Sequence, residues 1–155
     1  MIDTLHIMAV MPEIFLALTA MGFLMVGVFQ GNKATDVLCW SASFAFVIAA
    51  FLILNAHWDT QFALNNMLIV DHFSNVMKLI ILLGLIASLG LSIQYLYQER
   101  IARFEYPVLL MFAGIGMMLM VSANNFLSLY MSLELQSLSL YILAAFHRNS
   151  LKSGE

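Results

Sequence analysis

The stretch NNFLSLYMSLELQSLSLYILAAFHR, residues 124–148, decides the fold of this chain. About twenty mostly apolar residues are enough for a helix to cross the hydrocarbon core of a bilayer. The centre of this stretch carries one acidic residue, Glu134. A charged side chain at mid-bilayer costs about 2.5–3.5 kcal/mol on insertion scales, so such residues usually face protein or a water-filled path. We therefore predict that Glu134 is a buried carboxylate that faces the protein interior.

The expected neighbours of Glu134 are polar. At about 100° per residue, Tyr130, Ser137 and Tyr141 fall on the same helix face as Glu134, and the opposite arc carries leucines. Glu134 is therefore the candidate proton-handling residue, and the other three are possible supporting residues. A structural interpretation stays open at this point, in which Glu134 only hydrogen-bonds to another helix and holds the bundle together.

The composition places the chain in a membrane. Hydrophobic residues make up 63% and charged residues 10%, with a mean hydropathy of +0.93, whereas soluble domains carry about 25% charged residues. The apolar runs are long and lack the alternation of an outer-membrane barrel, which favours helices. We predict an all-α fold, a polytopic bundle of transmembrane helices in the lipid bilayer.

Five spans are expected. They cover residues 12–30, 37–55, 73–97, 107–123 and 124–147. Pro12 and Glu13 suit the first turn of the first span, where the helix dipole favours an acid. Asp71 is the expected N-cap of the third span. The preceding connection is the longest, and we expect residues 64–71 to fold back as a short piece that is either extended or interfacial.

The third span carries a second group of polar residues. Asp71, Asn75 and Lys78 are spaced by four and three positions and share one helix face. Lys78 lies about two turns inside the helix, near enough to its end to snorkel, so a functional role and a snorkelling or paired structural role are equally open. We count Lys78 and Asp71 as possible supporting site residues. In the fourth span, Gly114 and Gly116 would let another helix approach closely.

Several other kinds of site have no signal in the sequence. There is no nucleotide-binding glycine loop, nucleophile triad or metal-ligand spacing, and the single cysteine, Cys39, offers no disulfide framework. No basic run suggests nucleic acid. We expect no metal, no bound cofactor and no nucleic-acid partner. The N-terminal MIDTLHIM lacks the basic residues of a cleavable signal peptide, so the first span is expected to stay in the mature protein.

The basic residues predict the orientation in the membrane. Those outside the predicted spans all follow the first, third or fifth span: Lys33, Arg100, Arg103, Arg148 and Lys152. Because cytoplasmic loops carry an excess of Lys and Arg, we predict a periplasmic N-terminus and a cytoplasmic residue 155 in a bacterial inner membrane. Termini on opposite sides of the membrane require an odd number of spans, and the five predicted spans meet this requirement.

Four stretches of the sequence carry a family resemblance. They are MPEIFLAL (11–18), DHFSNVMKLIILLG (71–84), EYPVLLMFAGIGMMLM (105–120) and NNFLSLYMSLELQSLSLYILAAFHRNSLKSGE (124–155). Together they resemble subunit N of the bacterial proton-pumping NADH:quinone oxidoreductase, respiratory complex I, the counterpart of mitochondrial subunit 2. The resemblance implies an antiporter-like membrane-arm subunit of about fourteen helices, built from two inverted five-helix repeats that each contain a broken helix.

On this resemblance, Glu134 matches the family's fifth-helix glutamate, which pairs with a lysine on the seventh helix and takes part in proton translocation. NADH, FMN, the iron–sulfur clusters and quinone are handled elsewhere in the complex, so this chain is expected to bind no redox cofactor and to contact other membrane-arm subunits. The resemblance covers only the first third of the subunit. We therefore expect a truncated chain that lacks the lysine partner and is inactive by itself.

Two alternatives remain beside a complex I subunit. One is a subunit of a multi-subunit cation/proton antiporter, which shares the fold and the buried glutamate; co-purification with NADH dehydrogenase activity would separate the two. The other is a truncated structural membrane segment that transports nothing. In that case substitutions of Glu134 would alter assembly and leave proton flux unchanged.

Overall fold

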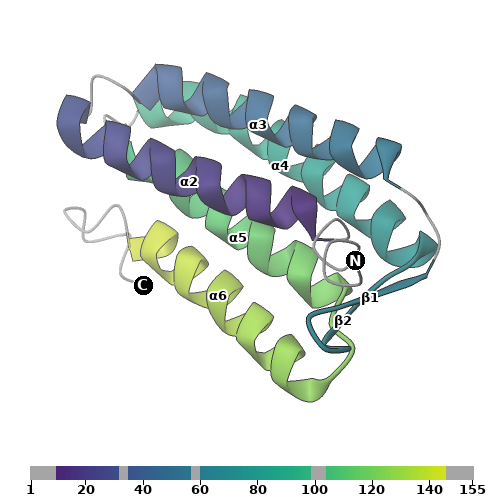
Figure 1. Ribbon diagram of the computed structural model, residues 1–155. Coiled ribbons are helices and arrows are strands. Elements are labelled where there is room, and N and C mark those ends of the chain that lie inside the picture. The colour runs from purple at the N-terminus through teal and green to yellow at the C-terminus, as the bar shows by residue number, and fades with distance from the viewer. Residues whose placement is uncertain (1–9, 32–34, 57–59, 99–103, 146–155) are drawn as a thin grey trace.

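Five helices and one small hairpin make up the part of the chain that the computed structural model describes, residues 10–31, 35–56, 60–98 and 104–145 (Figure 1). They are, in chain order, α2 (Met11–Gln30), α3 (Thr35–Asn55), β1 (Gln61–Ala63), β2 (Leu68–Val70), α4 (His72–Gln98), α5 (Glu105–Val121) and α6 (Phe126–Ala144). The predicted helical bundle is confirmed. Within these residues the departures from all-α structure are the hairpin and a single β-bridge between Leu68 and Ala123.

Four of the helices contain segments long and apolar enough to cross a membrane. These segments are Met11–Gln30, Val37–Asn55, His72–Ile93 and Phe126–Ala144. The fifth helix, α5, is apolar but has 17 residues, which gives a length of about 26 Å at 1.5 Å per residue, at the lower limit for a span. That α5 is the remaining span therefore stays a prediction.

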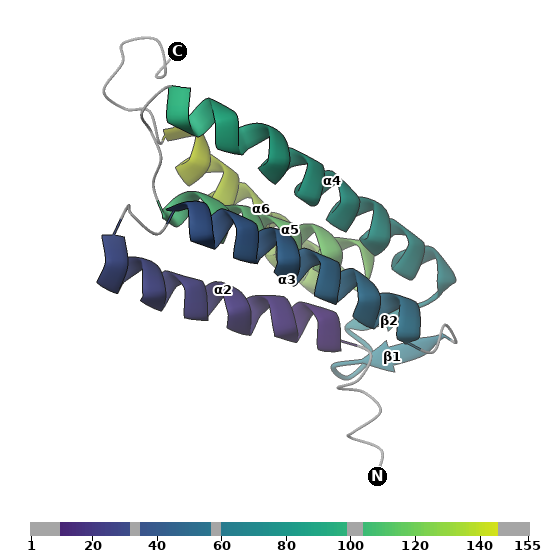
Figure 2. The same ribbon diagram turned by 90° about the horizontal axis from the view of Figure 1, so that it is seen from above.

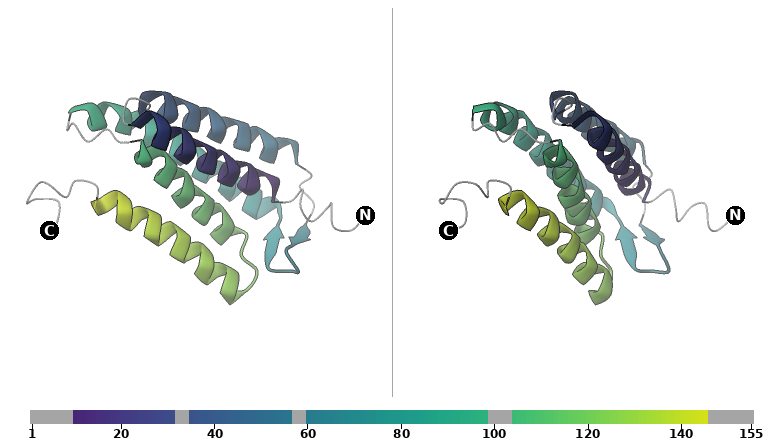
Figure 3. Two further views of the ribbon diagram at one scale, coloured as in Figure 1. Left: turned by 60° about the vertical axis from the view of Figure 1, so that its left-hand side comes forward. Right: turned by 90° about the vertical axis from the view of Figure 1, so that its left-hand side faces the viewer.

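In cross-section, the four helices α2, α3, α4 and α5 are arranged as a rhombus. Both α2 and α4 pack against α3 and α5, and α3 also contacts α5 across the short diagonal. In the view from above, α2 and α4 lie on either side of α3 (Figure 2). α6 lies at the edge of the bundle and packs on α5 (Figure 3). α2 and α4 thus face each other across the long diagonal of the rhombus.

The interior of the rhombus is apolar. Its buried side chains are Leu16, Ala20, Ala42, Ala45, Phe46, Ala49, Ile53, Leu82, Leu85, Leu89, Leu110, Met111, Ile115 and Met118. The alanines of α3 are spaced by three and four, so they share one face and let neighbouring helices come close. Large apolar side chains such as Trp40, Phe51 and Leu83 point outward and are exposed. An apolar surface of this kind suits lipid.

The hairpin closes one end of the bundle. β1 and β2 pair antiparallel, and the turn between them places Leu64, Asn65 and Asn66 at positive φ. Of the two structures expected for residues 64–71, the extended one is therefore correct. We call this the hairpin end: α2, α4 and α6 begin there, and α3 and α5 end there (Figure 1).

Asp71 is the N-cap of α4, as predicted. Its Oδ1 accepts a hydrogen bond from the Ser74 backbone N–H at 2.8 Å, and the Asp71 backbone N–H donates to Ser74 Oγ at 2.9 Å. This reciprocal pair is a capping box, which satisfies two backbone donors that the helix itself cannot. Asp71 therefore has a structural role at the start of α4.

Replacing Asp71 by Ala should lower the free energy of unfolding by about 1 kcal/mol, because the first turn of α4 loses its side-chain acceptor. Unfolding of the protein in detergent micelles, followed by circular dichroism, measures the change. Asp71→Asn keeps an acceptor oxygen and should be close to the parent protein. Equal losses for the two variants would contradict a capping role.

Candidate functional site

The start of α6, the helix that carries Glu134, is fixed by contacts with the hairpin. The Asn124 backbone N–H donates to Met67 O at 2.9 Å, and Asn124 Nδ2 donates to Asn66 O at 2.7 Å. The Ser128 hydroxyl, in the first turn of the helix, also donates to Met67 O at 2.9 Å. These bonds set where α6 begins, and they place Glu134 near the middle of the helix.

The rotation of α6 about its axis is set by close packing on α5. A Cβ atom at Gly116 would lie 2.9 Å from the backbone N of Gln136 and 3.0 Å from the backbone O of Ser132, so the two helices meet backbone to backbone there. The small residues Ser132 and Ser139 form the buried face of α6. The predicted close approach is confirmed at Gly116; at Gly114 the near neighbour is the Leu85 side chain of α4.

This packing turns Glu134 away from the bundle. Glu134 follows Ser132 by two positions, which is about 200° around the helix, and its side chain is exposed. Tyr130 and Tyr141 are exposed as well, at 61% and 68%, and Ser137 is partly buried. The prediction that Glu134 is buried and faces the interior is thus wrong for the residues described, because small residues and not the polar face contact α5.

The structure shows a buried charged pair that the sequence analysis did not identify. Lys78 Nζ of α4 lies 2.5 Å from Glu13 Oε1 of α2, and the two side chains are 1% and 4% exposed. Glu13 stands in the first turn of α2 as expected, but it has an ionic partner in addition to the helix dipole. Lys78 is thus paired inside the bundle and does not snorkel, and its functional role as a supporting site residue stays a prediction.

The pair connects two helices that are not main packing partners. α2 and α4 face each other across the long diagonal of the rhombus, with α3 and α5 between them. Lys78 can reach Glu13 because its ammonium stands at the end of a flexible four-carbon stem. The contact therefore lies inside the bundle, where both charges are shielded from lipid.

The pair could have been predicted from how far each of the two residues lies from the start of its helix. α2 and α4 begin at the same end, Glu13 is the third residue of α2, and Lys78 is the seventh residue of α4. At 1.5 Å per residue their depths differ by about 6 Å, which a lysine side chain can span. The structure does not bring Lys78 and Glu134 together, since Glu134 lies on the far face of α6.

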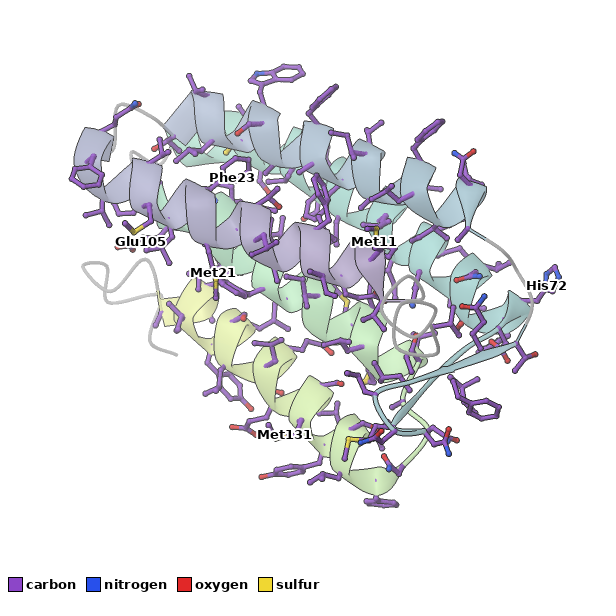
Figure 4. All side chains as sticks on the ribbon, viewed as in Figure 1. Met11, Met21, Phe23, His72, Glu105 and Met131 are labelled. Atoms are coloured by element: carbon purple, nitrogen blue, oxygen red, sulfur yellow. The ribbon has the colours of Figure 1, made fainter. Side chains whose placement is uncertain are left out.

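The labelled polar side chains mark the two ends of the bundle. His72 at the start of α4 and Glu105 at the start of α5 lie at opposite ends (Figure 4). In the parts of the chain that the structure describes, no three His, Cys, Asp or Glu residues converge as a metal site. The loop cations used for the orientation lie outside those parts. Among the residues whose burial the structure describes, the buried charged side chains are Glu13 and Lys78.

Sequence comparison finds similar proteins across the whole chain. The chain is 40% identical over 155 residues to "NADH-quinone oxidoreductase subunit N" of Paramagnetospirillum magneticum, covering 100% of this chain and 32% of that protein. It is 45% identical over 148 residues to the protein of the same name from Parvibaculum lavamentivorans, covering 94% and 30%. No family model matches. The chain spans about a third of the length of these relatives.

Comparison with solved structures finds the same kind of assembly. A chain of respiratory complex I from Thermus thermophilus with bound aureothin superposes with a TM-score of 0.71 at 26% sequence identity. The match covers 92% of this chain and 32% of that one. The helical arrangement described above is therefore shared with a chain of that respiratory complex.

Proposed function

Because this chain belongs to the subunit N family of the NADH-quinone oxidoreductases, we propose that it forms part of the membrane arm of such a complex. The complex would couple electron transfer from NADH to quinone to proton translocation. The chain is a multi-pass membrane protein, and its proposed contribution is to the proton path. NADH, FMN, iron–sulfur clusters and quinone would be handled by other parts of the complex, with other membrane-arm subunits and lipid as neighbours.

Within that role, we propose Glu134 as the proton-handling carboxylate. The observation that carries this proposal is its position: it is the one acidic or basic residue of α6, it lies mid-helix, and it shares an open face with Tyr130 and Tyr141. A charge facing lipid at this depth would cost about 2.5–3.5 kcal/mol. In the assembled complex this face should therefore be covered by water or by protein. The covering protein would correspond to the two thirds of the relatives' length that this chain does not span.

We also propose an orientation. α2, α4 and α6 end opposite the hairpin, and the loop cations follow these three helix ends in the sequence. Since positive charge is concentrated on the cytoplasmic side, the hairpin end would face the periplasm of a bacterial inner membrane. Glu13 and Lys78 would then lie in the periplasmic half of the bundle.

Replacing Glu134 by Gln in the full subunit within its complex should lower proton translocation by about tenfold or more, because the amide cannot exchange a proton in place of the carboxylate. Proton uptake by membrane vesicles, measured with NADH as electron donor, checks this. Glu105→Gln is the matched control: Glu105 is exposed at the end of the bundle opposite the hairpin, and its replacement should leave translocation unchanged.

The same experiment tests the two alternatives. If Glu134→Gln lowers the amount of assembled complex but leaves the translocation per complex intact, Glu134 is structural and the proposed role is wrong. If the full subunit purifies with a cation/proton exchanger and without NADH dehydrogenase activity, the chain belongs to an antiporter assembly. The subunit N name of the relatives favours the NADH-linked complex.

A further inference from the structure

We propose that Glu13, Lys78 and Asn75 form a water-binding site inside the rhombus near the hairpin end, separate from Glu134. All three residues are at least nine-tenths buried: the relative exposure of the whole residue is 3% for Glu13, 1% for Lys78 and 2% for Asn75. They come from two helices, α2 and α4, that face each other across the long diagonal. The site is thus enclosed by the bundle.

Three buried polar atoms at this place have no hydrogen-bond partner among the residues described: Glu13 Oε1, Glu13 Oε2 and Asn75 Nδ2. Glu13 Oε1 has the Lys78 ammonium as its ionic partner, which leaves one acceptor, Glu13 Oε2, and one donor, Asn75 Nδ2. Buried polar groups in folded proteins are nearly always hydrogen-bonded, and ordered water supplies the partner where the protein does not. One water molecule can donate to a carboxylate oxygen and accept from an amide, so it satisfies both atoms.

Helix geometry places the two atoms on facing surfaces. Asn75 precedes Lys78 by three positions, so both lie on the same face of α4. Lys78 Nζ contacts Glu13 Oε1, which shows that this face of α4 is directed at Glu13. The unpartnered amide and the unpartnered carboxylate oxygen therefore border the same ion pair.

The charge of the site favours an uncharged ligand. The Glu13 carboxylate and the Lys78 ammonium neutralise each other at contact distance, so an added cation or anion would leave a net charge in the interior, which is strongly disfavoured. Water carries no net charge and offers both donors and acceptors. The site therefore fits water better than an ion.

An experimental structure of the full complex, at a resolution that resolves ordered water, tests the proposal. We expect a solvent peak within about 3.2 Å of both Glu13 Oε2 and Asn75 Nδ2. A direct hydrogen bond between these two side chains, or bonds from both to other protein groups with no solvent peak, would overturn it. This readout does not depend on proton translocation, so its result is independent of the role proposed for Glu134.

A pair of variants makes the test specific. Asn75→Leu removes the amide donor and should abolish the solvent peak, while the contact between Lys78 and Glu13 remains. Thr19→Val is the matched control, because the Thr19 hydroxyl of α2 already donates within its own helix to Phe15 O at 3.0 Å or Leu16 O at 2.9 Å. The peak should persist in Thr19→Val, and a peak that persists in Asn75→Leu would show that Asn75 is not a ligand.

Discussion

Lys78→Met is expected to destabilise the bundle by about 3–5 kcal/mol, a large part of the total stability of an ordinary domain. Methionine has a similar length but no charge, so the Glu13 carboxylate stays in the interior without its partner. Removing one member of a buried pair is costly because the other charge is left uncompensated. The free energy of unfolding in detergent micelles, or the yield of assembled complex, measures the loss.

The double variant separates the ion pair from ordinary packing. Glu13→Gln should destabilise in the same direction as Lys78→Met, whereas combining the two removes both charges and should recover a substantial part of the loss. Glu105→Gln removes an exposed acid and serves as the control for a change of charge alone. If the double variant lost as much as the two single variants added together, the contact between Glu13 and Lys78 would contribute nothing specific.

Gly116→Leu should separate α6 from α5, with a cost of about 3 kcal/mol, at the upper end for an overpacked site. The atoms that a Cβ would meet are the backbone N of Gln136 at 2.9 Å and the backbone O of Ser132 at 3.0 Å. Backbone atoms cannot rotate out of the way as the end of a side chain can, so the whole of α6 has to move. Hydrogen–deuterium exchange of the α6 amides should rise in the variant.

Gly84→Ala is the matched control for this substitution. Gly84 also lies within a helix, but a Cβ at that position would meet nothing within 4 Å. Alanine is the better helix former by about 1 kcal/mol, so Gly84→Ala should leave stability equal or slightly higher. If Gly116→Leu were tolerated as well as Gly84→Ala, the backbone contact between α5 and α6 would not set the position of α6.

The features that the sequence predicted are local. The positions of the helices follow from apolar runs, and the cap of α4 follows from an aspartate placed three residues before Ser74. The close approach at Gly116 was also predicted, because a glycine on an apolar helix face leaves room for a neighbour. Each of these depends on residues within one segment of the chain. The structure confirms the helices, the cap and the close approach, and the bounds of the membrane spans stay a prediction.

The features that the sequence did not predict depend on which helices become neighbours. The contact of Lys78 with Glu13 requires that α2 and α4 start at the same end and lie across a rhombus, which no single helix pattern contains. The direction of Glu134 was predicted from the cost of placing a charge in lipid. The packing of Ser132 against Gly116 instead decides which face of α6 meets α5.

The contact across the rhombus also bears on how the protein is made. Glu13 leaves the ribosome with the first described helix, and Lys78 follows only after α3 and the hairpin have been synthesised. Until then the acid of α2 lacks the basic partner that it has in the folded structure, and a lone carboxylate resists entering the hydrocarbon. We therefore expect α4 to complete the stable insertion of α2, so that the biogenesis of this region depends on the joint arrival of several segments and not on helices entering the membrane independently.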